Sequence, residues 1–276
     1  MTDVDKNSSV LFEVSWEVCN KNGGLHTVIT SKIEEASKHF KQYFLIGPSF
    51  EVDQDSPEFI EDINLFKEWK DYTLKEKGIK VRIGRWNIAS APIVFLVDYT
   101  SFLSQKDTIF TKYWERYFLD SISGDWTYIE PCLFGHAAGV LIDSFQDFHF
   151  LDNKIIAHFH EWLSGAGVLY LKEYAPEITT VFTLHSTVLG KAIAEQGWAI
   201  HKDLETYNGE TLSNLLKVKA KHSLEKASAF NADCFTAISN PTAKECRYLL
   251  LKQPDIVSYN GYKSENISDD NYWKKE

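Results

Sequence analysis

Short apolar segments alternate with longer amphipathic ones along most of the chain. The short runs are rich in β-branched and aromatic residues, are bounded by turn or polar residues, and have the length of buried strands: Val10–Val14, Tyr43–Ile46, Ile93–Val97, Ile155–Phe159, Thr180–Thr183, Cys234–Ile238 and Ile256–Ser258. Between them, apolar residues recur at three- and four-residue spacing, which is typical of helices, over Gly24–His39, Pro131–Phe145 and Leu212–Phe230. This alternation predicts an α/β fold, a doubly wound Rossmann-like parallel sheet with helices on both faces.

Two stretches depart from the alternation. Residues from about Glu51 to Lys80 are rich in charge, and we expect a surface helix there. From Tyr262 onward the chain becomes polar. We therefore expect one Rossmann-like domain over residues 1–261 and a polar tail, or an interrupted interdomain junction, over residues 262–276.

Composition narrows the classes of partner. Of 276 residues 44% are hydrophobic, enough for a sizeable core, and the formal net charge of −10 argues against nucleic acid and against an anionic membrane surface. No apolar stretch reaches the roughly 18 residues that span a bilayer, and the N-terminus is polar and acidic. The four cysteines form no C-x-x-C pair, so we expect reduced thiols in a cytoplasmic protein.

The loop after the first strand, Ser15–Gly24, contains a candidate anion site. In doubly wound sheets ligands bind outside the carboxyl ends of the strands. Gly23 and Gly24 precede a helix there, so backbone N–H groups could approach a diphosphate closely, and Lys21 could add a positive charge. A Gly-Gly pair before a helix is more often plain turn chemistry, so the spacing alone leaves both interpretations open.

Histidines follow two later strands. His160 lies in the segment His158–Trp162, and His185 lies in Thr183–Thr187, after the next strand. A histidine at such a position can bind sugar hydroxyls or can simply be satisfied by backbone groups. Two consecutive parallel strands would bring both rings to one edge of the sheet. Without a His-x-x-x-His pair or a carboxylate-rich set beside them, we do not expect a metal.

Several blocks of sequence occur in the order of one known family. They are FEVSWEV at 12–18, KNGG at 21–24, YFLIGP at 43–48, GRW at 84–86, LFG at 133–135, FHEWL at 159–163, FTLHSTVLG at 182–190, PDIV at 254–257 and NG at 260–261. With these blocks the chain resembles the eukaryotic-type glycogen synthases, which also have bacterial members.

The resemblance implies the N-terminal, acceptor-side half of a GT-B glycosyltransferase, in which two Rossmann-like domains face each other across a cleft. It further implies the reaction of a glycogen (starch) synthase, a retaining transfer of glucose from UDP-glucose to the 4-hydroxyl end of an α-1,4-glucan without metal or cofactor. The implied partners are glycogen, the nucleotide sugar, and a C-terminal GT-B domain or a full-length synthase.

The resemblance also assigns residues. His160 matches the histidine that contacts the transferred glucose, and it is the candidate catalytic residue. The implied substrate-binding residues are Lys21, Gly23, Gly24, Glu161, Trp162, His185, Thr187 and Lys191. Of these, Lys191 stands where several relatives have arginine, which keeps the charge but loses a bidentate fork.

The family's C-terminal domain, which holds most donor contacts and an E-x7-E glutamate pair, should begin after Asn260-Gly261. The one pair at that spacing here is Glu68 and Glu76, in the charged stretch, where a solvated face is expected. We therefore expect half of a catalytic cleft, with little turnover by this chain alone. The alternative is a non-catalytic glucan-binding or regulatory module. A third hypothesis is another Rossmann-like sugar-nucleotide enzyme. The chain has no G-x-G-x-x-G after its first strand, which argues against dinucleotide binding.

Overall fold

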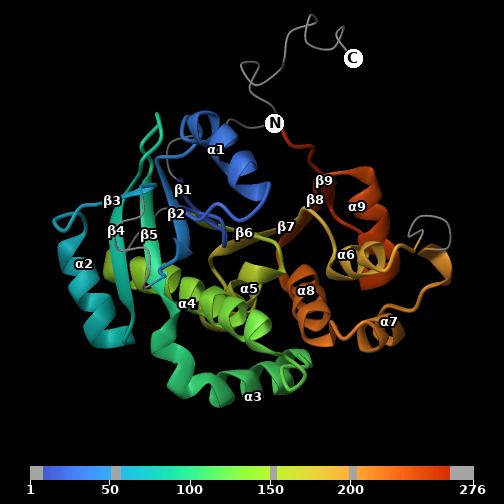
Figure 1. Ribbon diagram of the computed structural model, residues 1–276. Coiled ribbons are helices and arrows are strands. Elements are labelled where there is room, and N and C mark those ends of the chain that lie inside the picture. The colour runs from blue at the N-terminus through green and yellow to red at the C-terminus, as the bar shows by residue number, and fades with distance from the viewer. Residues whose placement is uncertain (1–8, 51–56, 150–153, 199–203, 262–276) are drawn as a thin grey trace, which may run out of the picture.

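A twisted sheet forms the centre of the protein (Figure 1). The computed structural model describes residues 9–50, 57–149, 154–198 and 204–261. Within these residues the strands are β1 (Ser9–Val14), β2 (Gln42–Pro48), β3 (Phe59–Glu61), β4 (Lys80–Trp86), β5 (Ile93–Asp98), β6 (Lys154–His160), β7 (Thr179–Leu184), β8 (Cys234–Ala237) and β9 (Ile256–Val257). They lie in the order β3-β4-β5-β2-β1-β6-β7-β8-β9.

The sheet is parallel from β5 to β9, and β3 and β4 add an antiparallel edge. The strand order reverses at β1, which pairs with β2 on one side and with β6 on the other. In open α/β sheets such a switch point leaves a crevice beyond the carboxyl ends of the strands. The crevice between β1 and β6 is therefore where the topology places a ligand site.

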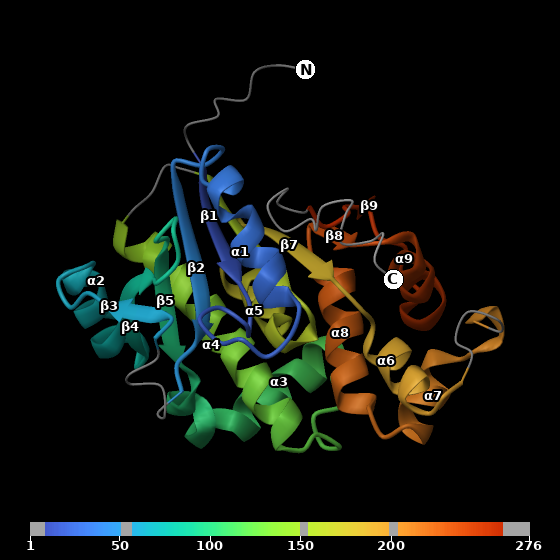
Figure 2. The ribbon, with the colours of Figure 1, turned by 45° about the horizontal axis from the view of Figure 1, so that its top comes forward.

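Helices cover both faces of the sheet. They are α1 (Leu25–Ala36), α2 (Lys67–Tyr72), α3 (Lys106–Tyr117), α4 (Trp126–His149), α5 (Ala166–Tyr174), α6 (Val188–Glu195), α7 (Gly209–Leu215), α8 (Lys219–Asn231) and α9 (Asn240–Glu245). Ile29 and Ile33 of α1 pack on one face with Leu11 of β1, whereas Phe12 faces the larger cluster formed with α4 and α5. Figures 1 and 2 show α1 on one side of the sheet and α4 with α5 on the other. The alternation along β1 thus gives each face its own core.

The strands expected from the apolar runs are confirmed, each within about two residues of its ends. The single helix expected over Leu212–Phe230 is wrong. It is broken between α7 and α8, where Lys217 has a φ of 57° and the Val218 N–H donates to the Ser213 carbonyl. A left-handed residue cannot continue a right-handed helix, although the apolar spacing runs on through it.

The charged stretch from Glu51 to Lys80 is only partly helical. It contains α2 and a π-helical turn over Thr73–Lys77, but also β3, which pairs with β4. Both Glu68 and Glu76 are exposed, as expected of a solvated face. Residues 51–56, and the tail expected over 262–276, lie outside the described residues.

Candidate active site at the carboxyl edge of the sheet

A cavity of about 450 Å³ lies over one face of the sheet, lined by alternate residues of β6, β7 and β8, and reaches the carboxyl ends of β6 and β7 at His160 and His185. Its wall combines residues of α1, the two histidine-bearing strand ends, and the segment after β9. The lining includes Lys32, His158, His160, Thr183, His185, Thr236, Tyr259 and Asn260. The structure therefore brings His160 and His185 to one edge, as the sequence predicted.

Glu13, on β1, is buried behind this cavity with 0% of its surface exposed. Its Oε1 accepts from His160 Nε2 at 2.6 Å and lies 2.5 Å from Lys32 Nζ, while Oε2 accepts from the Tyr43 hydroxyl. These partners come from β6, α1 and β2. A buried carboxylate needs such partners, because desolvation of an unpaired charge is very unfavourable.

The histidines continue the hydrogen-bonded chain across the sheet. His160 Nδ1 lies 3.1 Å from His185 Nε2. The rings of His158 and His160 lie 4.1 Å apart, and His158 Nε2 bonds Thr183 Oγ1 at 2.7 Å. Thr183 in turn bonds Thr236 Oγ1 at 2.6 Å. The floor of the cavity therefore contains two hydrogen-bonded chains, Glu13–His160–His185 and His158–Thr183–Thr236, which meet where the rings of His158 and His160 are in contact.

The charged groups at the floor of the cavity are the ion pair of Lys32 and Glu13, and the imidazole rings beside it are neutral. Burial alone would raise the pKa of Glu13, but the Lys32 ammonium and the hydrogen bond from His160 hold that pKa well below its ordinary value. Burial lowers the pKa of His160 and, with help from His160 and Lys32, lowers that of His185 to about 3. The pKa of His158 also falls well below its ordinary value through burial.

Glu13, His158 and His160 each offer a ligand atom within 4.8 Å of one another, a grouping that could hold a metal ion. The ammonium of Lys32 already contacts Glu13 Oε1 and supplies positive charge at this point. A metal ligated by Glu13 would have to displace or repel that ammonium. That this site binds its ligand without a metal ion remains a prediction.

The loop before α1 differs in detail from the expected anion site. The backbone N–H groups of Gly23 and His26 both donate to Glu17 Oε2, each at 2.9 Å. Gly24 is the N-cap of α1, and Lys21 is exposed. None of Lys21, Gly23 and Gly24 is among the residues that line the cavity. A carboxylate of the protein itself thus occupies the donors that the sequence assigned to a diphosphate.

Glu161, at the end of β6, is hydrogen-bonded to the loop after β7. Its backbone has φ 61° and ψ 163°, a region that is essentially restricted to glycine. Its buried carboxylate accepts from the backbone N–H groups of His185 at 2.9 Å and Ser186 at 3.1 Å, and lies 3.8 Å from Lys191 Nζ. Glu161 and Lys191 therefore support the loop that carries His185 and do not line the cavity.

Two other expected binding residues are buried away from the cavity. Thr187 caps α6, accepting from Gly190 N at 2.9 Å, and donates to Glu245 at 2.7 Å. Trp162 packs in the core with its ring parallel to that of Tyr128, 6.4 Å between centroids. The structure gives Trp162 no exposed face in the cavity for a sugar to stack on, since only 9% of its surface is accessible.

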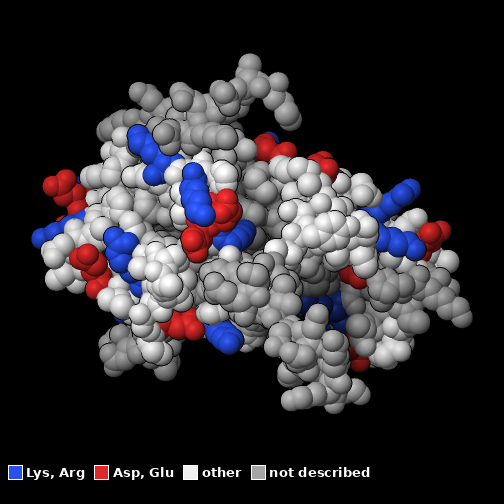
Figure 3. All heavy atoms as spheres, turned by 90° about the horizontal axis from the view of Figure 1, so that it is seen from above, with Lys and Arg blue, Asp and Glu red and all other residues white. Residues whose placement is uncertain are grey.

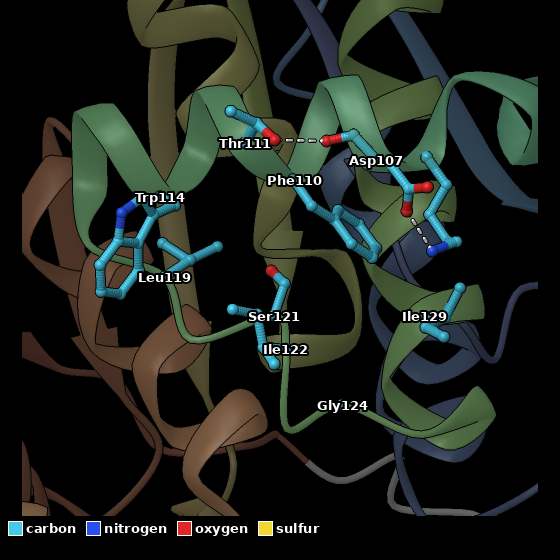
Figure 4. Close-up of a pocket in the computed structure, with 10 residues that line it drawn as sticks. Asp107, Phe110, Thr111, Trp114, Leu119, Ser121, Ile122, Gly124 and Ile129 are labelled. Atoms are coloured by element: carbon cyan, nitrogen blue, oxygen red, sulfur yellow. Dashed lines mark hydrogen bonds and ion pairs between the residues drawn. The ribbon is translucent and has the colours of Figure 1, made fainter.

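A second hollow, of about 340 Å³, lies between α3 and the start of α4 and shares no lining residue with the first. Figure 4 shows Phe110 and Ile129 pointing into it, with Thr111 bonded to the Asp107 carbonyl on the helix above. This hollow contains none of the histidines that line the first cavity. On the face shown in Figure 3, acidic and basic side chains are interspersed and form no contiguous basic patch.

The fold and the site define a Rossmann-like α/β domain with a histidine-lined cavity beside the switch point of its sheet. A family model described as glycogen synthase matches residues 13–269, so the chain belongs to the glycogen synthase family. The glycogen [starch] synthase of Dictyostelium discoideum is 31% identical over 263 residues, covering 94% of this chain and 29% of the relative. The liver glycogen [starch] synthase of Rattus norvegicus is also 31% identical, covering 94% of this chain and 37% of the relative.

The chain thus spans about a third of the length of the curated relatives it matches. Among solved structures, the catalytic domain of starch synthase IV from Arabidopsis thaliana aligns with a TM-score of 0.49 at 12% identity, covering 94% of this chain and 52% of that chain. An α,α-trehalose-phosphate synthase from Burkholderia xenovorans aligns with a TM-score of 0.44 at 11% identity, covering 89% and 43%. In the part of the chain that is described, no helix has the length and apolar character needed to cross a membrane.

Proposed function

We propose that this chain is the N-terminal, acceptor-side half of a glycogen synthase of GT-B type. Together with a donor-binding C-terminal domain, it would transfer glucose from UDP-glucose to the 4-hydroxyl end of an α-1,4-glucan in the cytoplasm, with retention and without a metal. The observation that carries the proposal is the cavity that holds His160 and His185 at the carboxyl ends of β6 and β7, formed by residues within the family match.

The chemistry of the cavity suits a neutral, hydroxylated ligand. Its histidines are uncharged near pH 7, since burial lowers their pKa values. Neutral imidazole and threonine hydroxyl groups bind sugar hydroxyls without drawing an anion into the site. The proposed role of His160 has one condition. Both of its ring nitrogens are bonded within the protein, so a direct bond from its side chain to glucose would require one of those bonds to open.

Half a cleft should support binding but not efficient transfer. Charged groups left open to water stabilise a developing charge weakly, and one wall cannot exclude water from the reacting atoms. We therefore expect the purified chain to bind glycogen while transferring little or no glucose from UDP-glucose, with or without EDTA.

The test is radiolabelled transfer from UDP-glucose to glycogen, with glycogen binding followed by co-sedimentation. Transfer at a rate near that of a full-length synthase would contradict the account of a half-cleft. Absence of both transfer and binding would remove support for an acceptor-side domain. Binding that persists without transfer, even after a donor-binding domain is supplied, would favour the alternative of a non-catalytic glucan-binding or regulatory module.

A further inference from the structure

A carboxylate two hydrogen bonds away from His185 sets which kind of atom that histidine can offer to a ligand. We propose that Glu13 is a positioning residue that makes His185 a hydrogen-bond acceptor at the cavity wall, so that the cavity takes a ligand hydroxyl there and disfavours an anionic oxygen. The proposal rests on the proposed function only for the identity of the ligand.

Glu13 is a buried carboxylate whose Oε1 faces both Lys32 and His160. Its Oε1 lies 2.5 Å from the Lys32 ammonium and 2.6 Å from His160 Nε2, and its side chain is shielded from solvent. An ionised carboxylate only accepts hydrogen bonds, so His160 Nε2 must carry the proton. Because Glu13 is held by residues of separate elements, water cannot readily take its place.

The other ring nitrogen of His160, Nδ1, carries no proton. A second proton on this ring would place a positive charge in a buried site that already holds the Lys32 ammonium, and burial and Lys32 lower the pKa of His160 accordingly. His160 is therefore neutral, and its Nδ1 is a lone pair. The partner at 3.1 Å, His185 Nε2, must then be the donor.

His185 carries this polarity to the cavity wall. With its proton on Nε2, a neutral His185 has a lone pair on Nδ1, and in the described part of the chain no residue bonds that atom. His185 lines the cavity and is only partly buried. A lone pair attracts an O–H group and repels phosphate or carboxylate oxygens. The hydroxyl groups of a glucosyl unit have the required polarity.

Tautomers can be measured directly on this chain. Long-range ¹H–¹⁵N correlation spectra of histidine-labelled protein distinguish Nδ1 from Nε2 protonation, and His160→Asn and His185→Asn variants would assign the two rings among the nine histidines. We expect both rings to be neutral with the proton on Nε2 at pH 7. Protonation of either ring on Nδ1, or an imidazolium at His160, would overturn the proposal.

Variants of Glu13 separate its role as an acceptor from its bulk. Glu13→Leu removes the acceptor, and we expect a mixture of tautomers at His160 and altered ¹⁵N shifts at His185. Glu13→Gln keeps an acceptor oxygen and should retain the wild-type tautomers. Tyr43→Phe removes a different partner of Glu13 and is the matched control. Unchanged tautomers in a folded Glu13→Leu protein would refute the proposal, and if that variant does not fold, the wild-type and Glu13→Gln spectra still decide it.

Ligand affinity gives an independent readout. Using calorimetry with UDP-glucose and with glycogen, we expect Glu13→Leu to weaken binding of whichever ligand the wild type takes by about tenfold, the equivalent of one lost hydrogen bond. Glu13→Gln should stay within about threefold. Equal affinity in wild type and Glu13→Leu would count against the proposal. If the wild type binds neither ligand, the proposed function fails, while the tautomers continue to test the role of Glu13.

Discussion

Glu17 occupies the backbone donors that an anion would use at the start of α1. The N–H groups of Gly23 and His26 both bond its carboxylate. We expect Glu17→Ala to free these donors and raise the affinity for UDP several-fold, while the loop loses about 0.5–2 kcal/mol of stability, as when a helix cap is removed. Calorimetric titration with UDP measures the affinity, and Glu34→Ala, an exposed carboxylate on the same helix, is the control. Weaker UDP binding in Glu17→Ala would show instead that Glu17 holds the loop before α1 in the conformation that binds UDP.

His222, on α8, makes the stability of the fold depend on pH. Its ring is 1% exposed, neither nitrogen has a hydrogen-bond partner within the described residues, and burial lowers its pKa to about 4. Between the unfolded pKa near 6.5 and the folded value, the unfolded chain binds a proton that the folded chain does not, so stability falls as pH falls.

Replacing His222 with leucine should remove this dependence. Between pH 7.5 and pH 5, we expect the free energy of unfolding of His222→Leu to rise by about 1–2 kcal/mol relative to that of the wild type, because leucine stays neutral in both the folded and the unfolded state. Urea unfolding at the two pH values measures the gain, and His39→Gln, at an exposed position of the chain, is the control. An equal stability difference at both pH values would contradict the prediction.

At the scale of elements, α4 and α5 meet so closely that glycine is required at the contact. A Cβ at Gly167 would lie 2.2 Å from Phe159 Cε1 and 2.8 Å from the Gly135 carbonyl oxygen. We expect Gly167→Ala to destabilise the protein by about 1–3 kcal/mol through overpacking. In contrast, a Cβ at Gly24 meets nothing within 4 Å, so Gly24→Ala should be neutral or slightly stabilising. Thermal unfolding of the two variants checks the contrast, and equal melting temperatures would refute it.

The parallel strands of this sheet could be predicted because buried parallel strands are continuous apolar runs between polar loops. The break between α7 and α8 could not, since it depends on the left-handed backbone of Lys217 and leaves the apolar spacing intact. The two antiparallel edge strands, β3 and β4, were missed because neither is a continuous apolar run. β3 has only three residues, two of them exposed, and β4 carries Lys80, Arg82 and Arg85 among its apolar residues.

The candidate site, like the fold, could be predicted where it follows a sequence pattern and not where it depends on tertiary contacts. The histidines at the ends of β6 and β7 could be placed together because neighbouring parallel strands end at one edge. Glu13 and Lys32 were missed, although a lone carboxylate within the apolar strand Val10–Val14 signals that a buried partner must exist. The identity of that partner depends on the packing of α1 against β1, which no sequence spacing reveals. Trp162 was misjudged because an aromatic residue beside a ligand site packs inward as readily as outward.

At the scale of the whole molecule, the cavity opens beside exposed apolar side chains. Its lining runs from α1 through β6, β7 and β8 to the segment 256–261, which contains β9. Ile256 and Tyr259 of that segment are 56% and 65% exposed. The relatives are about three times as long as the matched region, so a further domain can face this surface in them. In the proposed enzyme, closure by that domain would lower the local dielectric around the Glu13–His160–His185 chain and strengthen its hydrogen bonds to a ligand.

A chimera with a relative's remaining segment should transfer glucose. Residues 1–261, joined to the segment of the Dictyostelium discoideum synthase that follows its matched region, should transfer glucose from UDP-glucose to glycogen at least about a hundredfold faster than either part alone, because water exclusion and positioning need both walls. In that chimera Glu13→Leu should lower kcat/KM by about tenfold or more, whereas Glu68→Gln, at an exposed carboxylate of α2, should leave it unchanged. A folded chimera that binds glycogen and UDP-glucose but shows no transfer would indicate that this domain has kept binding and lost catalysis. Equal loss in the Glu13 and Glu68 variants would indicate a general defect of the chimera rather than a role for the buried carboxylate.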